Sequence, residues 1–206
     1  MYIADRYENT DRKDIENFIA ENSFGILVNQ TEGKLWATHI PLELDLNEKG
    51  EQVLYGHISK ENPQWKGFAE NDQVLAIFSG PHAYISSSWY DFENVPTWNY
   101  SAVHIYGTVK IIDGQAEIAH LTKLVDKYEA HSENPVSVGK FSKKTMMQTR
   151  GIVTFEIAIQ QIQAVRKLSQ NRDEKNFNSI ITELEKLSDP NAKAVAADMR
   201  KCPFSK

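Results

Sequence analysis

The alternation of apolar and polar side chains from Tyr100 to Ile112 limits most strongly how this chain can fold. Val103 and Ile105 fall on one face of an extended segment, and His104 and Tyr106 fall on the other. The alternation continues beyond them to the end of the segment. A period of two is typical of a strand with one buried face and is incompatible with a helix.

Shorter segments of the same kind precede and follow this strand, with helices at both ends of the chain. A helix is expected up to about Glu21, capped by Thr10 or Asp11. Further strands are expected at Phe24–Asn29, Leu35–Asp45, Val53–Ser59, Val74–Ser79, Ile152–Ile159 and Ile162–Leu168. Further helices are expected at Glu61–Ala69, after Asp113-Gly114, after the Ser132–Gly139 connection, and in two pieces of Asn171–Lys201 broken at Ser188-Asp189-Pro190.

At least five strands with short turns, followed by helices, predict an α+β protein built on an antiparallel β-barrel. Residues 1–170 are expected to form the barrel domain. Residues 171–206 are expected to form a C-terminal helical extension packed on it, because a segment of this length cannot bury a core of its own.

Composition narrows the classes of protein that the chain can belong to. The chain has 206 residues and a net charge of −5, which gives no overall attraction for nucleic acid. The sequence contains no apolar run long enough to cross a bilayer, and its charged first residues lead us to expect no signal peptide. Its one cysteine, Cys202, cannot form a disulfide framework. A cytoplasmic protein without membrane contact is therefore expected.

Motifs for several common chemistries are missing from the sequence. It contains no Gly-x-Gly-x-x-Gly or Walker loop, no Gly-x-Ser-x-Gly elbow and no His-Glu-x-x-His helix. The six histidines have no metal-ligand spacing, so no metal site is expected. Nothing in the residues specifies a catalytic group.

Aromatic residues concentrate in the segment Phe78–Tyr106. The chain has 21 aromatic residues, which are nine Phe, four Trp and eight Tyr. Eight of the 21 lie in this segment, and two of those eight are tryptophans. His82, His104, Asn94 and Asn99 lie among them. Flat rings beside hydrogen-bonding groups are typical of a site for a planar heteroaromatic ligand or of a packed interface.

Five motifs in order resemble the PaiB family over nearly the whole chain, from about residue 1 to residue 201. They are ATHIP (37–41), LYGHISKENPQW (54–65), FSGPHAYIS (78–86) followed by WY, VPTWNY (95–100) and KLSQN (167–171). Ser87 stands where the family usually has Pro, and Glu61 where it usually has Ala. Neither difference removes a charged or ring-bearing group.

The resemblance implies an FMN-binding negative transcriptional regulator with the split-barrel fold, forming a homodimer with the flavin at the subunit interface. The implied flavin contacts are Thr38, His39, Ile40, His57, Ser59, Lys60, Asn62, Trp98, Asn99, Lys167 and Gln170. The first three would follow the edge of the flavin ring, chiefly through backbone groups. The next four would address the phosphate and the ribityl chain, where a lysine can act as a point charge.

Structural roles compete with several of these assignments. Trp65 and Trp89 can be packing residues, and Thr97–Tyr100 can form a tight turn. His104 and Tyr106 can face a dimer partner, and Lys167–Asn171 can be a strand end that caps the next helix at Asn171.

Three functions are consistent with this pattern. The first is a flavin-binding homodimer of the regulator family, and the alternative is a flavin-dependent oxidoreductase that acts on a small molecule, with His39 or His104 as proton donor. Direct DNA contact is the third. A basic run without acids supports DNA contact. The second tail helix argues against it, because it lacks the Arg, Asn and Gln residues expected of a recognition helix. The basic run consists of Lys140, Lys143, Lys144 and Arg150.

Overall fold

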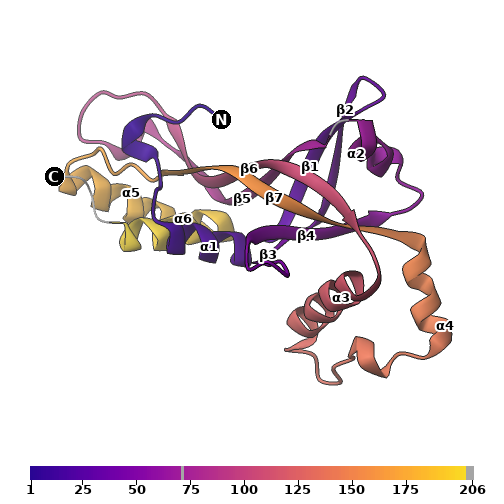
Figure 1. Cartoon of the computed structure of the whole chain (residues 1–206). Helices are drawn as coiled ribbons and strands as arrows, with labels where there is room; N and C mark the ends of the chain where they lie inside the picture. Colours follow the sequence, from indigo (N-terminus) through magenta and orange to yellow (C-terminus); the bar gives the residue numbers. More distant parts are fainter. Residues whose placement is uncertain (71, 203–206) are drawn as a thin grey trace. The chain divides into compact units, whose positions relative to one another are not determined.

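The structure is a computed structural model that describes residues 1–70 and 72–202 (Figure 1). Its strands are β1 (Phe24–Thr31), β2 (Lys34–Pro41), β3 (Glu43–Leu46), β4 (Gln52–Ser59), β5 (Gln73–Ile85), β6 (Thr97–Ile112) and β7 (Ile152–Lys167). Its α-helices are α1 (Arg12–Glu21), α2 (Gly67–Glu70), α3 (Gly114–Glu129), α4 (Lys143–Met146), α5 (Glu174–Lys186) and α6 (Pro190–Lys201). Short 3-10 turns are η1 (Asp5–Tyr7), η2 (Pro63–Lys66), η3 (Ser87–Trp89), η4 (Val138–Lys140) and η5 (Met147–Gly151).

The seven strands form one sheet in the order β2-β1-β5-β6-β7-β4-β3. The pairs β1/β2, β1/β5, β3/β4 and β4/β7 are antiparallel. β2 and β3 stand at the two ends of this order, so no hydrogen-bonded pair among the described strands closes the sheet into a full barrel. The predicted α+β class, an antiparallel split barrel with flanking helices, is confirmed.

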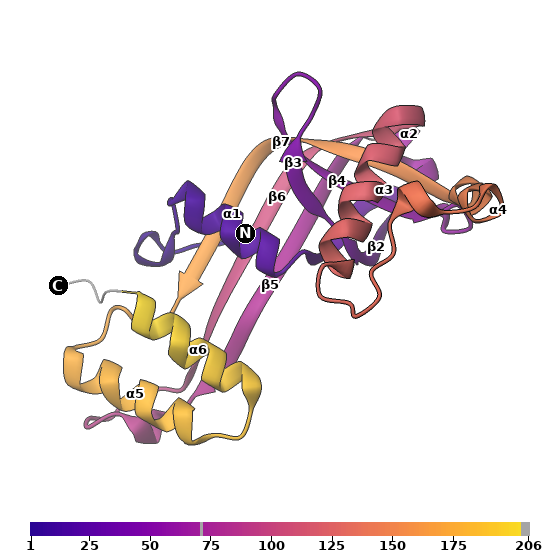
Figure 2. The ribbon, with the colours of Figure 1, turned by 90° about the horizontal axis from the view of Figure 1, so that it is seen from below.

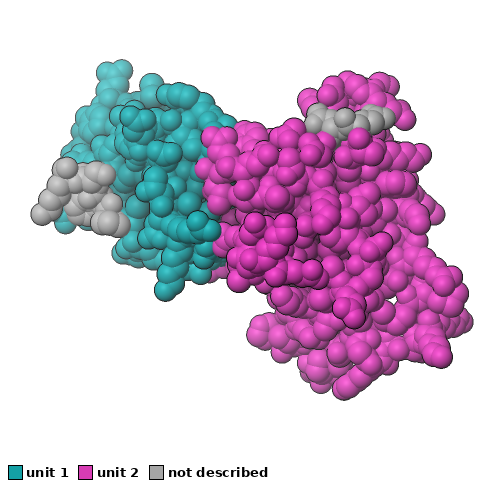
Figure 3. Space-filling model, in the orientation of Figure 1, with its two compact units in different colours: residues 1–18, 79–104, 163–206 teal, residues 19–78, 105–162 magenta. Residues whose placement is uncertain are grey.

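The chain divides into two compact units (Figure 3). Unit 1 comprises residues 1–18, 79–104 and 163–206, and unit 2 comprises residues 19–78 and 105–162. β5, β6 and β7 each contribute residues to both units. The predicted domain boundary at residue 170 stays a prediction.

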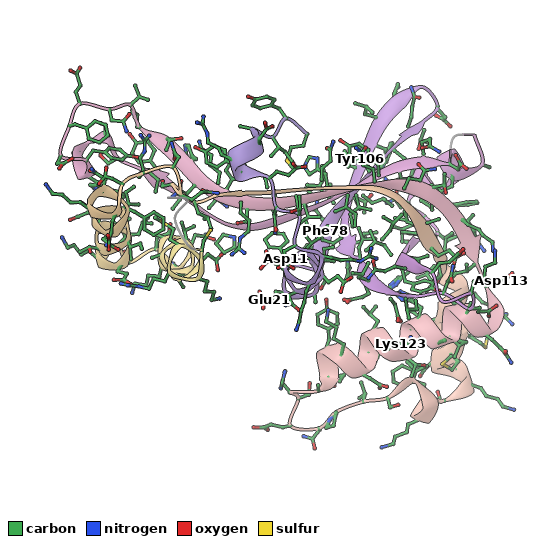
Figure 4. All side chains as sticks on the ribbon, turned by 60° about the vertical axis from the view of Figure 1, so that its left-hand side comes forward. Asp11, Glu21, Phe78, Tyr106, Asp113 and Lys123 are labelled. Atoms are coloured by element: carbon green, nitrogen blue, oxygen red, sulfur yellow. The ribbon has the colours of Figure 1, made fainter. Side chains whose placement is uncertain are left out.

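The core of unit 2 lies between strands whose backbones approach closely. Val53–Ser59 of β4 pairs with Ile152–Ala158 of β7, and Leu54, Phe155 and Ile157 are fully buried. The rings of Phe68 and Phe155 meet edge to face with centroids 5.4 Å apart. Helix α3 carries Lys123 (Figure 4), whose ammonium pairs with Asp45 of β3.

Unit 1 contains a separate apolar core made largely by its two C-terminal helices. α5 and α6 run side by side (Figure 2) and bury Phe177, Ile180, Leu184, Val195 and Met199. The end of β5 and Leu168 complete this cluster. The apolar faces of both helices are therefore used within the unit.

Local sequence signals account for most element boundaries. The carboxylate of Asp11 (Figure 4) accepts a hydrogen bond from the amide of Asp14 at 3.0 Å and caps α1. The carboxylates of Asp173 and Asp189 cap α5 and α6 in the same way, each at 3.0 Å. Pro190 occupies the first turn of α6, where its missing N–H costs nothing.

Three of the predicted strand assignments were wrong. The expected strand Leu35–Asp45 is two strands, β2 and β3, because the first pairs with β1 and the second pairs with β4. The expected strands Ile152–Ile159 and Ile162–Leu168 are one continuous strand, β7. The polar pair Gln160-Gln161 stays extended and exposed instead of turning.

Among the described residues, no helix combines the length and the apolar character needed to cross a lipid bilayer.

Gly107 of β6 tests how tightly the strands of unit 2 approach one another. A Cβ at this position would overlap the carbonyl oxygen of Ala158 and lie 2.7 Å from Cγ2 of Ile157. Because a backbone atom cannot move aside cheaply, Gly107→Ala should lower the free energy of unfolding by about 1–3 kcal/mol. Urea denaturation measures this change.

Gly139 provides the matched control, since a Cβ there would meet nothing within 4 Å. Gly139→Ala should leave stability unchanged or raise it slightly through the unfolded chain. Equal effects of the two substitutions would contradict the close approach at Gly107.

Candidate functional site

Seven of the predicted flavin contacts lie in unit 2, on β2, on β4 and in the turn that follows β4. Thr38, His39 and Ile40 belong to β2, which is an edge strand. His57 and Ser59 lie at the end of β4, and Lys60 and Asn62 follow directly. Within β2 the His39 side chain is exposed and Ile40 is buried.

A hydrogen-bonded clamp joins β2 to the turn after β4. The Asn62 side-chain amide donates to Oγ1 of Thr38 at 2.9 Å, and that hydroxyl donates to Oε1 of Gln64. The fully buried Gln64 also donates from Nε2 to the carbonyl of Leu27 at 3.0 Å. Thr38 and Asn62 therefore support the turn, and their side-chain groups already have partners.

Lys60 is held by hydrogen bonds to its backbone, and its ammonium has no ion-pair partner in the part of the chain that the structure describes. Its amide donates to the carbonyl of Gly151 at 2.8 Å, and its carbonyl accepts from the Trp65 indole at 3.0 Å. Among residues 1–70 and 72–202, no acidic group forms an ion pair with its Nζ. The hydroxyl of Ser59 accepts from the amide of Glu61 at 3.2 Å, which leaves its proton available for a ligand.

Lys60 borders a hollow of about 540 Å³ in unit 2. Trp65, Ile111, Ile152 and Val153 form much of its apolar wall. The other lining residues are Ile112, Asp113, Glu117, Thr149, Arg150 and Thr154. Burial, and then the charge of Asp113, raise the pKa of Glu117.

The donor set of this hollow fits the needs of FMN. Lys60 and Arg150 can meet a phosphate, and the apolar wall can cover a flat ring. The Oγ1 atom of Thr154 is buried and has no hydrogen-bond partner within the described part of the chain. A buried polar atom without a partner is costly, so a bound group could satisfy it.

His57 packs against helix α3. Its ring meets that of His120 edge to face at 5.9 Å, and Tyr55 stacks on His120 at 5.7 Å. Nδ1 of His57 and Nε2 of His120 are buried without hydrogen-bond partners in the part of the chain that the structure describes. A contact between His57 and the flavin stays a prediction.

Burial lowers the pKa of both histidines. Burial alone lowers the pKa of His57. Burial, and then the charge of the nearby His57, lower the pKa of His120 to about 4. Glu43 and Asp45 oppose this shift, and Lys123 adds to it. The pair therefore packs as two neutral rings at neutral pH.

The other four predicted contacts, Trp98, Asn99, Lys167 and Gln170, lie in unit 1. Asn99 is fully buried and accepts a hydrogen bond from the Ser169 hydroxyl at 3.0 Å. The Gln170 side chain donates to the carbonyls of Arg166 at 2.6 Å and Arg6 at 3.3 Å. Both amides therefore support the local structure.

Trp98 and Lys167 remain accessible, on different surfaces. The Trp98 side chain is 52% exposed and meets the rings of His82 and Tyr84, each with centroids 6.0 Å apart. Lys167 contacts the hydroxyl of Thr97 and lines a cavity of about 460 Å³ within unit 1.

Sequence reasoning missed two cations of that cavity, Arg6 and Arg172. Arg172 directly follows the KLSQN motif, so its position was a signal that could have been used. Arg6 reaches the site only because the N-terminal segment runs beside the end of β7, where Glu8 pairs with Val165. No local pattern marks that pairing.

The two histidines considered as proton donors have different surroundings. His39 is exposed on β2, with its ring centroid 6.4 Å from that of Phe24. His104 in unit 1 is half-buried, and burial, followed by the N-terminal amino group, lowers its pKa. Within the described residues, no cluster of three or more His, Cys, Asp or Glu side chains could hold a metal ion.

Comparison with known proteins adds a family and a fold. A family model described as "Putative FMN-binding domain" matches residues 1–161. The chain is 46% identical over 198 residues to "Protease synthase and sporulation protein PAI 2" of Bacillus subtilis (strain 168), covering 95% of each chain. It is 27% identical to "Uncharacterized protein AN0679" of Emericella nidulans, covering 97% of this chain and 96% of that one.

Two solved structures share the fold at low sequence identity. A FAD and heme binding protein from Mycobacterium smegmatis is 16% identical with a TM-score of 0.61, over 78% of this chain and 73% of that one. The flavocytochrome Anf3 from Azotobacter vinelandii is 14% identical with a TM-score of 0.60, and the match covers 86% of this chain and 78% of that one. At these identities the likeness concerns the fold alone.

The histidine pair predicts an acid dependence of stability. His120 has a pKa of about 4 in the folded chain, against an ordinary value of 6.5. Above pH 6.5 the residue is neutral in both states. As the pH falls from 6.5 toward 4, the unfolded chain takes up a proton that the folded chain does not, so the free energy of unfolding should fall by up to about 1.4 kcal/mol per pH unit.

Denaturant titrations between pH 8 and pH 4 on the wild type and on His120→Gln measure this dependence. The variant should lose part of the slope below pH 6.5, whereas His131→Gln, at an exposed position, should keep it. Identical slopes for wild type and His120→Gln would show that the buried pair does not control stability.

Proposed function

The chain belongs to the PaiB family of FMN-binding split-barrel proteins, and from this premise we propose that Ser59, Lys60 and Arg150 hold the FMN phosphate. The observation that carries the proposal is Lys60, whose backbone is fixed by Gly151 and Trp65 while its ammonium has no ion-pair partner among the described residues. Such a lysine can act as a phosphate-binding point charge without losing an existing ion pair.

The apolar wall beside Lys60 supports the same assignment. Trp65, Ile152 and Val153 offer flat and branched apolar surface, and the hollow is within the size range of cofactor sites. Following the family resemblance, we place the edge of the ring along Thr38, His39 and Ile40. Through the Gln64 clamp, Thr38 and Asn62 fix the turn that presents Lys60.

FMN supplies a ring that can accept and return electrons when it is bound. The residues of the chain bind and orient it, and they exclude water from one side. The small-molecule oxidoreductase reading needs a substrate and an electron donor, which these residues do not specify. Flavin binding is therefore the function that the geometry supports best.

A homodimer is the second part of the proposal. β2 is an edge strand, and exposed apolar side chains lie on it and on the adjacent β1. Leu35 of β2 is 83% exposed, and Phe24 of β1 is 67% exposed. Edge strands and apolar patches of this kind are costly to leave in water and are typical of interfaces. In this assembly, Trp98 of the partner subunit would close over the flavin.

Direct DNA binding is outside this proposal. The apolar faces of α5 and α6 are buried within unit 1, and Lys193, Arg200 and Lys201 are the cations of α6. Arg200 and Lys201 pair with acids. A regulatory role would therefore act through other contacts.

We also propose a cytoplasmic location, because the single cysteine cannot support a disulfide framework.

Loss of the Lys60 charge should weaken FMN binding. We expect the wild type to quench FMN fluorescence on titration and Lys60→Met to raise the dissociation constant about tenfold or more, since a charge-assisted contact is lost. The visible spectrum of the purified protein provides a second measure of bound flavin.

Lys193→Met is the matched control, because Lys193 is exposed on α6 and lines neither hollow. It should bind FMN as the wild type does. Absence of both quenching and flavin absorbance at micromolar wild-type protein would sink the flavin proposal. Equal binding by Lys60→Met and wild type would remove Lys60 from it.

The dimer has its own test by light scattering. The wild type should show twice the 23.5 kDa mass of one chain, and Leu35→Lys should shift the mass toward one chain, because a charge would be buried against the partner. Leu187→Lys is the control at an exposed leucine at the end of α5. A wild-type mass of 23.5 kDa would contradict the dimer.

A further inference from the structure

The cavity of unit 1 differs in charge from the hollow beside Lys60. Its lining contains three cations, Arg6, Lys167 and Arg172, and among the described residues no Asp or Glu lines it. The Lys60 hollow instead has two cations and two acids. Like charges gathered without a counter-charge repel one another, and a bound anion relieves that repulsion.

None of these three cations forms an ion pair elsewhere in the described part of the chain. The Arg6 guanidinium lies 5.3 Å from the centre of the Tyr7 ring, and that of Arg172 lies 5.1 Å from the centre of the Tyr90 ring. Stacking on a ring orients a guanidinium and leaves its N–H groups available. Burial, and then the charge of Arg172, lower the pKa of Lys167.

Buried polar contacts fix the turn that carries two of the cations. Ser169 lies between Lys167 and Arg172 with a φ of 59°, in the left-handed region that a serine rarely adopts. Its hydroxyl donates to the fully buried Asn99 at 3.0 Å, and the amide of Arg172 donates to its carbonyl at 3.0 Å. A strained backbone held by buried bonds is a feature of binding sites.

The N-terminal segment lines the same cavity and is tied to the same turn. The Gln170 side chain donates to the carbonyl of Arg6 at 3.3 Å, and the Tyr7 hydroxyl donates to Oδ1 of Asn171 at 3.2 Å. The amide of Asn9 donates to the carbonyl of Ala164 at 2.9 Å. Arg6 is thus held at the cavity by hydrogen bonds to the turn between Lys167 and Arg172.

We propose that this cavity is an oxyanion-binding site, separate from the phosphate end of the flavin site, for a small molecule with a phosphate or carboxylate on an apolar or aromatic body. Arg6, Lys167 and Arg172 bind the anionic group, and guanidinium forks match the geometry of both anions. Tyr2, Tyr100 and Val165 are among the residues that offer surface for the body of the ligand. The volume of about 460 Å³ suits a molecule of this size.

Lys60 still binds the FMN phosphate in this proposal, whereas Lys167 binds the second anion instead of the flavin. The proposal assigns Asn99 and Gln170 to positioning, which agrees with the internal hydrogen bonds that both side chains make. Both amides then act on the ligand through the cations that they place.

Calorimetric titration of the full chain with phenyl phosphate and with inorganic phosphate at low ionic strength tests the site. The wild type should bind both, phenyl phosphate several-fold more tightly because its ring is buried against tyrosines. Arg172→Gln and Arg6→Gln should each weaken binding about tenfold or more. Equal affinity for the two probes would overturn the apolar part of the proposal.

Two variants make the result independent of folding and of the flavin. Arg172→Gln loses its stacking on Tyr90, so Arg6→Gln, checked by its thermal midpoint, carries the result if the first variant is unstable. Lys60→Met should weaken FMN and leave phenyl phosphate unchanged. If instead Lys60→Met leaves FMN binding unchanged while Arg6→Gln weakens phenyl phosphate, the flavin proposal fails and this one stands.

FMN-saturated protein distinguishes the two sources of a phosphate. Phenyl phosphate should bind with the same affinity in the presence and absence of FMN, and Arg6→Gln should not alter FMN binding. Competition between FMN and phenyl phosphate, with both weakened by Arg6→Gln, would make the cavity part of the flavin site and overturn the proposal. Absence of heat and of any rise in thermal midpoint at millimolar phenyl phosphate would also overturn it.

Discussion

The buried amide of Gln64 is the interaction on which the candidate flavin site depends. A fully buried amide must find partners, and Gln64 finds them on β1 through the carbonyl of Leu27 and on β2 through Thr38. Its own carbonyl accepts from the side chains of Asn29 and Thr31, each at 3.3 Å. Gln64, in the turn that follows β4, therefore fixes this turn against two strands that precede it in the chain.

Close backbone approach makes this arrangement possible. A Cβ on Gly67 would lie 2.6 Å from the carbonyl oxygen of Gln30, so the segment after η2 can reach β1 only with glycine there. Lys60 lies at the other end of the same turn, where Gly151 and Trp65 hold its backbone. The free ammonium is a consequence of this fixed frame, because the bonds that hold the residue use only its main chain.

Elements with strong local signals were predictable from the sequence, and contacts between distant segments were not. Asp11, Asp173 and Asp189 precede amphipathic helices, and each caps one. The division of Leu35–Asp45 into two strands depends on their pairing with different strands, β1 and β4, which no pattern within the segment indicates. Local propensity cannot report a partner that another element supplies.

The same limit applies to the candidate site. Motif order pointed to Ser59 and Lys60, which remain accessible, and to Thr38 and Asn62, which turn out to support the turn. A motif records that a residue type is needed and does not say whether it touches a ligand or a neighbour. That distinction needs the hydrogen bonds of each side chain, which only the structure gives.

Strand periodicity explains why the ring-rich segment Phe78–Tyr106 serves more than one surface. Trp98 and Asn99 are neighbours in β6, so their side chains point to opposite faces. Trp98 meets His82 and Tyr84 and stays half-exposed, whereas Asn99 is fully buried beside Ser169. A single stretch can thus present rings on one face of unit 1 while its other face supports a cation-lined cavity. Its aromatic content alone could not separate a ligand site from an interface, because the alternation of β6 places the exposed ring and the buried amide on opposite faces.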